Sequence, residues 1–128
     1  MLTNLRVLVV EAEFLVALEI QRVLEQANAA GTAFARSIAE AAGLEARFSE
    51  FDLAIIEMPA GDAAAITLAS HLADSGVAVV GMIGEAAAIR RASLPAHIPL
   101  VNKPFGDAEL LTACATALAS VPRPRGAA

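Results

Sequence analysis

The stretch LRVLVV, residues 5–10, is a nearly continuous run of apolar and β-branched side chains. Such a run is typical of a strand that is buried on both faces, as the strands of a parallel sheet are. The residues after it have apolar side chains at the spacing of an amphipathic helix: Val16, Ile20, Val23, Leu24 and Ala27. The first 27 residues therefore predict a strand followed by a helix.

The same alternation of strand and helix signals continues along the chain. Further strands are expected at 32–36, 52–57, 77–83 and 98–101, and further helices at 37–48, 62–74, 85–92 and 107–120. The expected N-caps of three helices are Ser37, Asp62 and Asp107, with Glu40 completing a capping box after Ser37. Five strands alternating with helices predict an α/β fold, in which helices cover both faces of one parallel sheet.

The composition fits one domain with an aliphatic core. Of the 128 residues, 57% are hydrophobic but only 4% are aromatic, so Leu, Ile, Val and Ala must fill the core. Cys114 is the only cysteine, which excludes an intramolecular disulfide and a multi-thiolate zinc site. It lies on an apolar helical face, where a buried thiol is expected. We expect one domain over residues 1–121 and a disordered tail, PRPRGAA, at 122–128.

Charge and hydropathy exclude several kinds of partner. The net charge is −5 and no basic stripe lies outside the tail, so nucleic-acid binding is not expected. No apolar stretch reaches the ~18 residues of a membrane span. The sequence shows no secretory signal either, because the apolar run after Arg6 ends at Glu11. We expect a cytoplasmic protein that does not enter a membrane.

Ligands of parallel sheets gather where the strands end, which directs attention to Glu11–Glu13, Glu57–Pro59, Ile83–Glu85 and Lys103. The sequence has no Ser-His-Asp arrangement, phosphate-binding loop or dinucleotide fingerprint, so it does not predict an enzyme. His71 and His97 have no catalytic partner nearby in sequence and are expected to be structural or solvated. Gly81, within a strand, is expected to allow close packing or a bulge.

Four segments carry a family resemblance. The segments VLVVEAEFLVALEI (7–20), FDLAIIEMP (51–59), GVAVVGMIG (76–84) and PLVNKPF (99–105) resemble, in order, the four signature blocks of response-regulator receiver domains. The resemblance covers about residues 5–120, and the sequence of these segments is most similar to that of single-domain receivers of alphaproteobacteria. It implies a flavodoxin-like (βα)5 three-layer sandwich with strand order 2-1-3-4-5. It also implies a cis peptide bond between Lys103 and Pro104.

The resemblance also implies roles for individual residues. A working receiver has an acidic pair after strand one, a phosphoacceptor Asp after strand three, a Thr or Ser after strand four and a Lys after strand five. The acidic pair aligns with Glu11 and Ala12, and the phosphoacceptor position is Glu57. The hydroxyl position is Ile83, and only Lys103, followed by Pro104, is kept.

Two neighbouring positions also depart from the family pattern. Glu13 lies one place beyond the acidic pair, where it is expected to open the first helix and to join an acidic pocket with Glu11. The aromatic residue that often marks the fifth strand is replaced by Leu100. Asp52, at the opening end of the third strand, is expected to have a local role far from this pocket.

These replacements argue against the usual phosphorylation chemistry. Glu57 places the acceptor oxygen about one methylene too far, and a misplacement of ~1 Å can cost about a hundredfold in rate. Ala12 removes a carboxylate that would hold Mg²⁺, which neutralises charge during phosphoryl transfer. Ile83 removes the hydroxyl that would bind the phosphoryl group. Together they predict a pseudo-receiver.

Glu57 and Lys103 are expected to form an ion pair. One hypothesis is that this pair mimics a permanently activated state. The favoured one is that a former phosphorylation site kept an acid because its pocket is polar, since Ile83 has no hydroxyl to transmit the mimicry. Glu11, Glu13 and Glu57 could hold a divalent cation weakly, but Lys103 can neutralise them instead. No metal and no Mg²⁺ cofactor are therefore expected.

The sequence thus predicts a signalling module that acts through protein–protein contact, with a histidine kinase or another signalling protein as partner. By analogy, the face of helix four, strand five and helix five, about residues 85–118, would bind that partner or a second copy. Two alternatives remain open. One is a working phosphoreceiver that needs Mg²⁺ and an acyl-phosphate donor. The other is a small enzyme or ligand-binding domain on a flavodoxin-like scaffold.

Overall fold

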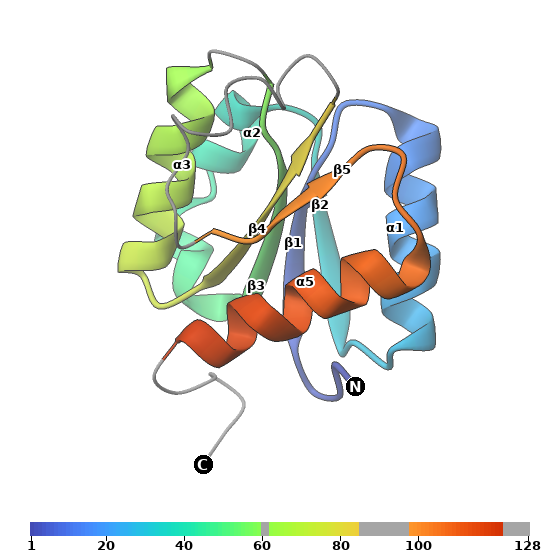
Figure 1. Cartoon of the computed structure of the whole chain (residues 1–128). Helices are drawn as coiled ribbons and strands as arrows, with labels where there is room; N and C mark the ends of the chain where they lie inside the picture. The colour runs from blue at the N-terminus through green and yellow to red at the C-terminus, as the bar shows by residue number, and fades with distance from the viewer. Residues whose placement is uncertain (60–61, 85–97, 122–128) are drawn as a thin grey trace.

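A computed structural model describes residues 1–59, 62–84 and 98–121, and contains one five-stranded parallel sheet (Figure 1). The strands lie in the order β2-β1-β3-β4-β5, with these bounds: β1 Arg6–Val10, β2 Gly31–Ala35, β3 Leu53–Glu57, β4 Ala78–Ile83 and β5 Leu100–Asn102. Every pair of neighbouring strands is parallel. The predicted fold class and strand order are confirmed.

Helices cover both faces of this sheet (Figure 1). One face is covered by α1 (Phe14–Gln26) and α5 (Asp107–Ser120). The other is covered by α2 (Ile38–Ala42), a 3-10 helix (Glu45–Glu50) and α3 (Ala63–Asp74). The arrangement is the expected three-layer sandwich.

The core consists of two apolar layers, because successive side chains of a strand point to opposite faces. Leu8, Val10 and Ile56 pack with α2 and α3. Val7, Val9 and Ile55 pack with α1 and α5. Burial on both faces explains why the strands read as continuous apolar runs. It also fixes their register, since a slip of one residue would exchange the two layers.

The second predicted helix is only partly correct. Ser37 is the N-cap, and its hydroxyl accepts a hydrogen bond from the Glu40 N–H at 3.0 Å, as expected. The α-helix ends at Ala42, however, and residues 45–50 form a 3-10 helix in place of the predicted continuation. The alanine-rich stretch buries only Ala41 of α2. Residues 45–50 instead form the 3-10 helix, in which Phe48 is buried.

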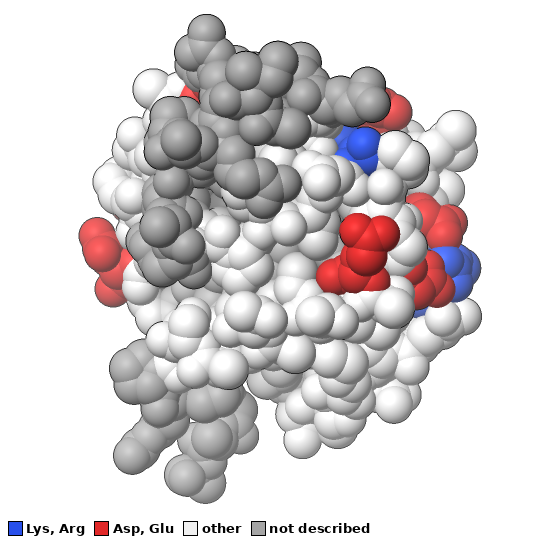
Figure 2. All heavy atoms as spheres, viewed as in Figure 1, with Lys and Arg blue, Asp and Glu red and all other residues white. Residues whose placement is uncertain are grey.

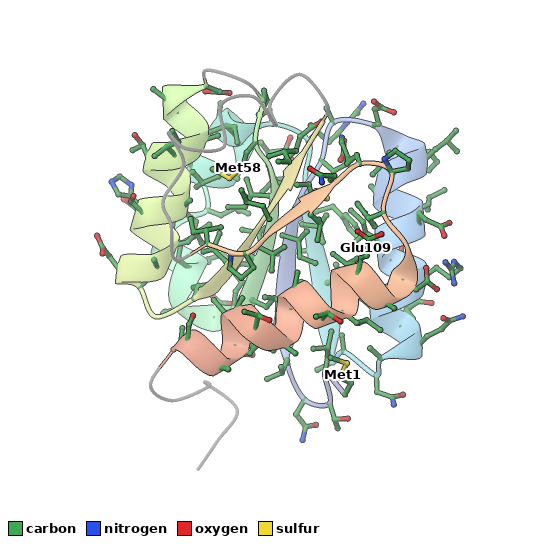
Figure 3. All side chains as sticks on the ribbon, viewed as in Figure 1. Met1, Met58 and Glu109 are labelled. Atoms are coloured by element: carbon green, nitrogen blue, oxygen red, sulfur yellow. The ribbon has the colours of Figure 1, made fainter. Side chains whose placement is uncertain are left out.

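The other predicted helix starts gave mixed results. Asp62 is confirmed as the N-cap of α3, because its carboxylate accepts hydrogen bonds from the N–H groups of Ala64 and Ala65. Asp107 was wrong as the cap of α5: the N-cap is Gly106, and Asp107 is the first helical residue. The Gly106 N–H donates to the Glu109 carboxylate at 3.3 Å. Figure 3 labels Glu109 near the start of α5. A carboxylate in the first turn therefore does the capping.

Several smaller expectations can also be placed. Cys114 lies on the buried face of α5, and burial raises the pKa of its thiol to about 12. His71 lies on α3 with an exposed side chain, 3.6 Å from a carboxylate oxygen of Glu45. The predicted helix at 85–92, His97 and the tail at 122–128 lie outside the described residues. None of the described helices has the length and apolar character needed to span a membrane.

Gly81 in the middle of β4 permits close packing, as expected. A Cβ atom at this position would lie 2.7 Å from Met58 Sδ and 2.8 Å from Leu100 Cδ2. Both distances are too short for ordinary contact. Met58 is almost fully buried between the sheet and α3 (Figure 3), so it has little room to move.

Gly81→Ala is therefore expected to lower the free energy of unfolding by about 1–2 kcal/mol through overpacking. The matched control is Gly31→Ala in β2, where nothing lies within 4 Å of the added Cβ and stability should not fall. Urea unfolding of both variants measures the difference. Equal stability of the two variants would contradict the packing argument.

Candidate functional site

Three predicted side chains meet where β1, β3 and β5 end. Lys103 follows β5, and its ammonium nitrogen lies 2.8 Å from Glu57 Oε2 and 3.1 Å from Glu11 Oε1. Glu57 is the last residue of β3, and Glu11 follows the last residue of β1. The expected Glu57–Lys103 pair is present. One ammonium group therefore bridges two carboxylates from two other segments, and we call these three residues the lysine triad.

Glu11 is the most enclosed member of the triad. Its side chain has no exposed surface. Oε1 faces Lys103, and Oε2 accepts a hydrogen bond from the Glu13 N–H at 3.0 Å. Both carboxylate oxygens are thus satisfied, as a buried carboxylate requires. Glu13 contributes this backbone donor as the N-cap residue of α1, while its own side chain is not part of the triad.

Glu57 and Lys103 are partly exposed, with 26% and 19% of their side-chain surfaces accessible. The Ala12 N–H makes a long hydrogen bond of 3.4 Å to Glu57 Oε1. Burial lowers the pKa of Lys103, but hydrogen bonds and charge from Glu57 and Glu11 outweigh it, so that the pKa is raised above its ordinary value. Lys103 is therefore a cation at neutral pH.

The remaining positions implied by the resemblance provide no polar side chain. Ala12 adds a methyl group at the edge of the triad, where the resemblance implies a carboxylate. Ile83 is fully buried and packs in the apolar layer beneath α2 and α3. Its carbonyl oxygen accepts a hydrogen bond from the Lys103 N–H at 2.8 Å, which joins the ends of β4 and β5. Leu100 packs against the same layer, and the Lys103–Pro104 peptide bond is cis, as expected.

The residues in this site supply fewer magnesium ligands than the resemblance implies. Mg²⁺ needs oxygen ligands in near-octahedral geometry, yet both oxygens of Glu11 already have partners. Glu57 also has a hydrogen bond on each oxygen, and Ala12 has no ligand atom in its side chain. Within the described residues, no group of three or more His, Cys, Asp or Glu side chains could hold a metal ion. The ammonium group occupies the position between the carboxylates.

Asp52 lies at the opposite end of β3, as expected. It is buried, and its Oδ2 accepts a hydrogen bond from the Arg6 N–H at 2.9 Å. The Asp52 N–H donates in turn to the Arg6 oxygen. Asp52 therefore aligns the starts of β1 and β3 and takes no part in the triad.

Sequence reasoning missed two backbone contacts of the site. The N–H groups of Ala12 and Glu13 each donate to a carboxylate of the triad. Residue type carries no signal for a backbone donor. The only available indication was position, since residues 12 and 13 connect a strand to the N-terminus of a helix, where N–H groups are unpaired.

No protein-family model matches the chain, and no curated protein matches it. Solved structures do. A response regulator receiver protein from Sinorhizobium medicae matches with a TM-score of 0.76 and 20% identity, over 94% of this chain and 98% of that one. The receiver domain of the Erythrobacter litoralis PhyR response regulator matches with a TM-score of 0.72 and 21% identity, over 95% of both chains.

A third match is a receiver domain protein from Bacillus halodurans, with a TM-score of 0.71 and 22% identity, over 90% of this chain and 97% of that one. All three similarities extend over nearly the whole of both molecules. Together with the strand order and the lysine triad at the strand ends, they establish the architecture. The chain has the fold of response-regulator receiver domains.

Proposed function

We propose that this chain is a receiver-like signalling module that is not phosphorylated in the usual way and acts by contact with a protein partner. The observation that carries the proposal is the loss of polar groups from the pocket: position 12 is Ala, and Ile83 is fully buried in the apolar layer. Lys103 compensates one of the two carboxylate charges of Glu11 and Glu57, and the site lacks the second carboxylate after β1 that would help to hold Mg²⁺. Without the metal, charge on an incoming phosphoryl group is not neutralised.

The apolar replacements support the same proposal. Ala12 cannot supply the second carboxylate, and the buried Ile83 cannot donate a hydrogen bond to a phosphoryl oxygen. A permanent mimic of an activated state would need a side chain that binds the carboxylate of Glu57 and changes position when it does so. Ile83 packs in the core instead. We therefore favour a static polar pocket over the mimic, with output through a surface of the domain.

The partner is proposed to be a protein, such as a histidine kinase or another signalling protein. The surface in Figure 2 shows more acidic than basic side chains among those drawn, consistent with the net charge of −5. Such a surface favours partners with basic contact residues. The face at 85–118 proposed by analogy includes residues 85–97, which lie outside the described residues.

The test is incubation with acetyl phosphate or beryllofluoride plus Mg²⁺, followed by intact-protein mass spectrometry and NMR. No phosphoryl adduct should form, and the amide signals around Glu57, Ile83 and Lys103 should not shift. A titration with Mg²⁺ alone should leave the Glu11 and Glu57 signals unmoved. An adduct, with signal changes that spread to α5, would instead identify a working phosphoreceiver.

A further inference from the structure

A groove lies between α1 and the edge strand β2. Its volume is about 450 Å³, and its apolar lining includes Phe14 and Leu18 of α1 and Phe34 of β2. Ala12 and Glu11, a member of the lysine triad, also line the groove. We call this feature the α1–β2 groove. It is large enough to receive a bulky side chain.

The groove exposes large apolar side chains. Phe14 is 71% exposed, Leu18 44% and Phe34 38%. Isolated exposed apolar residues are common, but adjacent ones around a concave surface are typical of interaction sites. The chain has only five phenylalanines, and two of them line this groove.

Beside the groove, β2 has a backbone edge with no neighbouring strand among the described residues, since β2 ends the sheet. The Glu11 N–H donates to the Ala35 oxygen, so the backbone of Ala35 faces β1. Backbone groups alternate in direction along a strand. The N–H and C=O groups of Thr32 and Phe34 therefore face away from the sheet. These are the groups that an added strand would bind.

The sequence of β2 does not protect this edge. Exposed edge strands are usually blocked by charged residues, proline or a bulge. The strand GTAFA, residues 31–35, contains no charge and no proline, and its pairing with β1 is continuous, without a bulge. Phe34 thus presents an aromatic side chain and outward-facing backbone groups at the same position.

The charges around the groove indicate which charge its occupant carries. Glu40 lines the groove with Arg36, Glu13 precedes Phe14, and Glu25 lies one turn beyond the lining residue Gln21, with which it forms a hydrogen bond. Acidic residues therefore outnumber basic ones at its rim. A second copy of this chain would carry the same acidic surface and a charge of −5, which opposes self-association.

We propose that the α1–β2 groove binds an extended segment of a partner protein, which adds to the edge of β2 as a sixth strand. The segment places one apolar or aromatic side chain in the groove and carries Lys or Arg on its flanks. Backbone hydrogen bonds to Thr32 and Phe34 provide affinity, and the groove provides side-chain specificity. This inference rests on the proposed interaction function and deepens it by giving the partner a chemical class.

The test is selection of a random peptide library, displayed on phage, against the whole protein. Enriched peptides should contain a central apolar residue with basic flanks. A synthetic copy of an enriched peptide should lose at least about tenfold in affinity for Phe34→Glu and for Thr32→Pro, whose proline removes an outward-facing N–H that an added strand would bind. The matched control is Leu15→Glu, an exposed leucine of α1 outside the lining of the groove, which should leave affinity unchanged.

Peptides that are N-methylated at every second amide test strand addition without changing the protein. Methylation of the amides that face β2 should abolish binding, whereas methylation of the amides that face away should not. Selected peptides that bind Phe34→Glu as well as they bind the native chain would overturn the groove assignment while leaving a protein-binding function in place. Failure to enrich any peptide would overturn it as well. Sedimentation that shows a dimer lost in Phe34→Glu would assign the groove to a second copy.

Discussion

Lys103→Met is expected to lower the free energy of unfolding by about 2–4 kcal/mol, because it leaves the carboxylates of Glu11 and Glu57 together without a cation. The Glu11 side chain has no exposed surface, so water cannot replace the lost ammonium group there. Breaking a buried ion pair from one side typically costs about 3–5 kcal/mol. The expected loss is somewhat smaller because Glu57 and Lys103 are partly exposed. Urea unfolding at neutral pH measures it.

The contribution of Lys103 to the stability of the fold should decrease at high pH. Its pKa is raised in the folded state above the ordinary value of 10.5. A group of this kind stabilises the fold fully below its unfolded pKa, and the contribution is lost as pH rises through the folded pKa. The stability difference between the native chain and Lys103→Met should therefore be constant from neutral pH to about pH 10 and shrink above that.

Two controls separate the triad from a general loss of charge. Arg22 pairs with Glu19 and Asp107 on the exposed surfaces of α1 and α5, and Arg22→Met should change stability far less, because exposed ion pairs are weak. Combining Glu11→Gln with Lys103→Met should recover part of the loss, because the buried charge is then removed together with its partner. A Lys103→Met protein as stable as Arg22→Met would mean that the triad does not stabilise the fold.

The strands and long helices could be predicted from sequence because each has a strong pattern. LRVLVV is a nearly continuous apolar run and AVVGMI a continuous one, and apart from the exposed Arg6 the strands that they form are buried on both faces. The stretch after Ser37 was harder, since alanine favours a helix without specifying which face is buried. Its second half forms a 3-10 helix in which Phe48 is buried. Gly106 was missed as a cap because Asp107 is the better capping residue type.

The triad was partly predictable and the groove was not. Parallel strand ends meet at one edge, so Glu57 and Lys103 could be paired from topology alone. The burial of Glu11 depended on a donor from the Glu13 backbone, which no residue pattern reveals. The α1–β2 groove combines Phe14 and Leu18 with Phe34. The groove forms because of the way α1 packs beside β2. The residues that connect α1 to β2 carry no sequence motif that predicts this packing.

Restoring three side chains should restore phosphorylation if the alignment with receiver domains is correct. The triple variant Ala12→Asp, Glu57→Asp and Ile83→Thr is expected to form an adduct with acetyl phosphate and Mg²⁺. The phosphoryl group would pass from acetyl phosphate to a carboxylate oxygen at position 57; the bond between phosphorus and the acetyl oxygen breaks, and acetate is released. The rate should exceed that of the native chain by about a hundredfold or more. Intact-protein mass spectrometry over time provides the measurement.

The geometry bears differently on each restored group. The Ala12 N–H lies 3.4 Å from Glu57 Oε1, so a carboxylate at position 12 would lie close to the one at position 57 and could share a metal ion with it. Asp at position 57 draws the acceptor oxygen back by one methylene. The new Thr hydroxyl enters a fully buried position and costs about 1–3 kcal/mol unless it finds a partner. Stability must therefore be measured beside reactivity.

Two further variants decide which loss matters most. The double variant Glu57→Asp and Ile83→Thr keeps the methyl group of Ala12, and it should react much more slowly than the triple variant because the second metal-binding carboxylate is missing. Ala12→Asp with Glu57→Ala should form no adduct, since the acceptor is absent. A folded triple variant that stays inert would show that the receiver fold alone does not make this pocket a phosphorylation site.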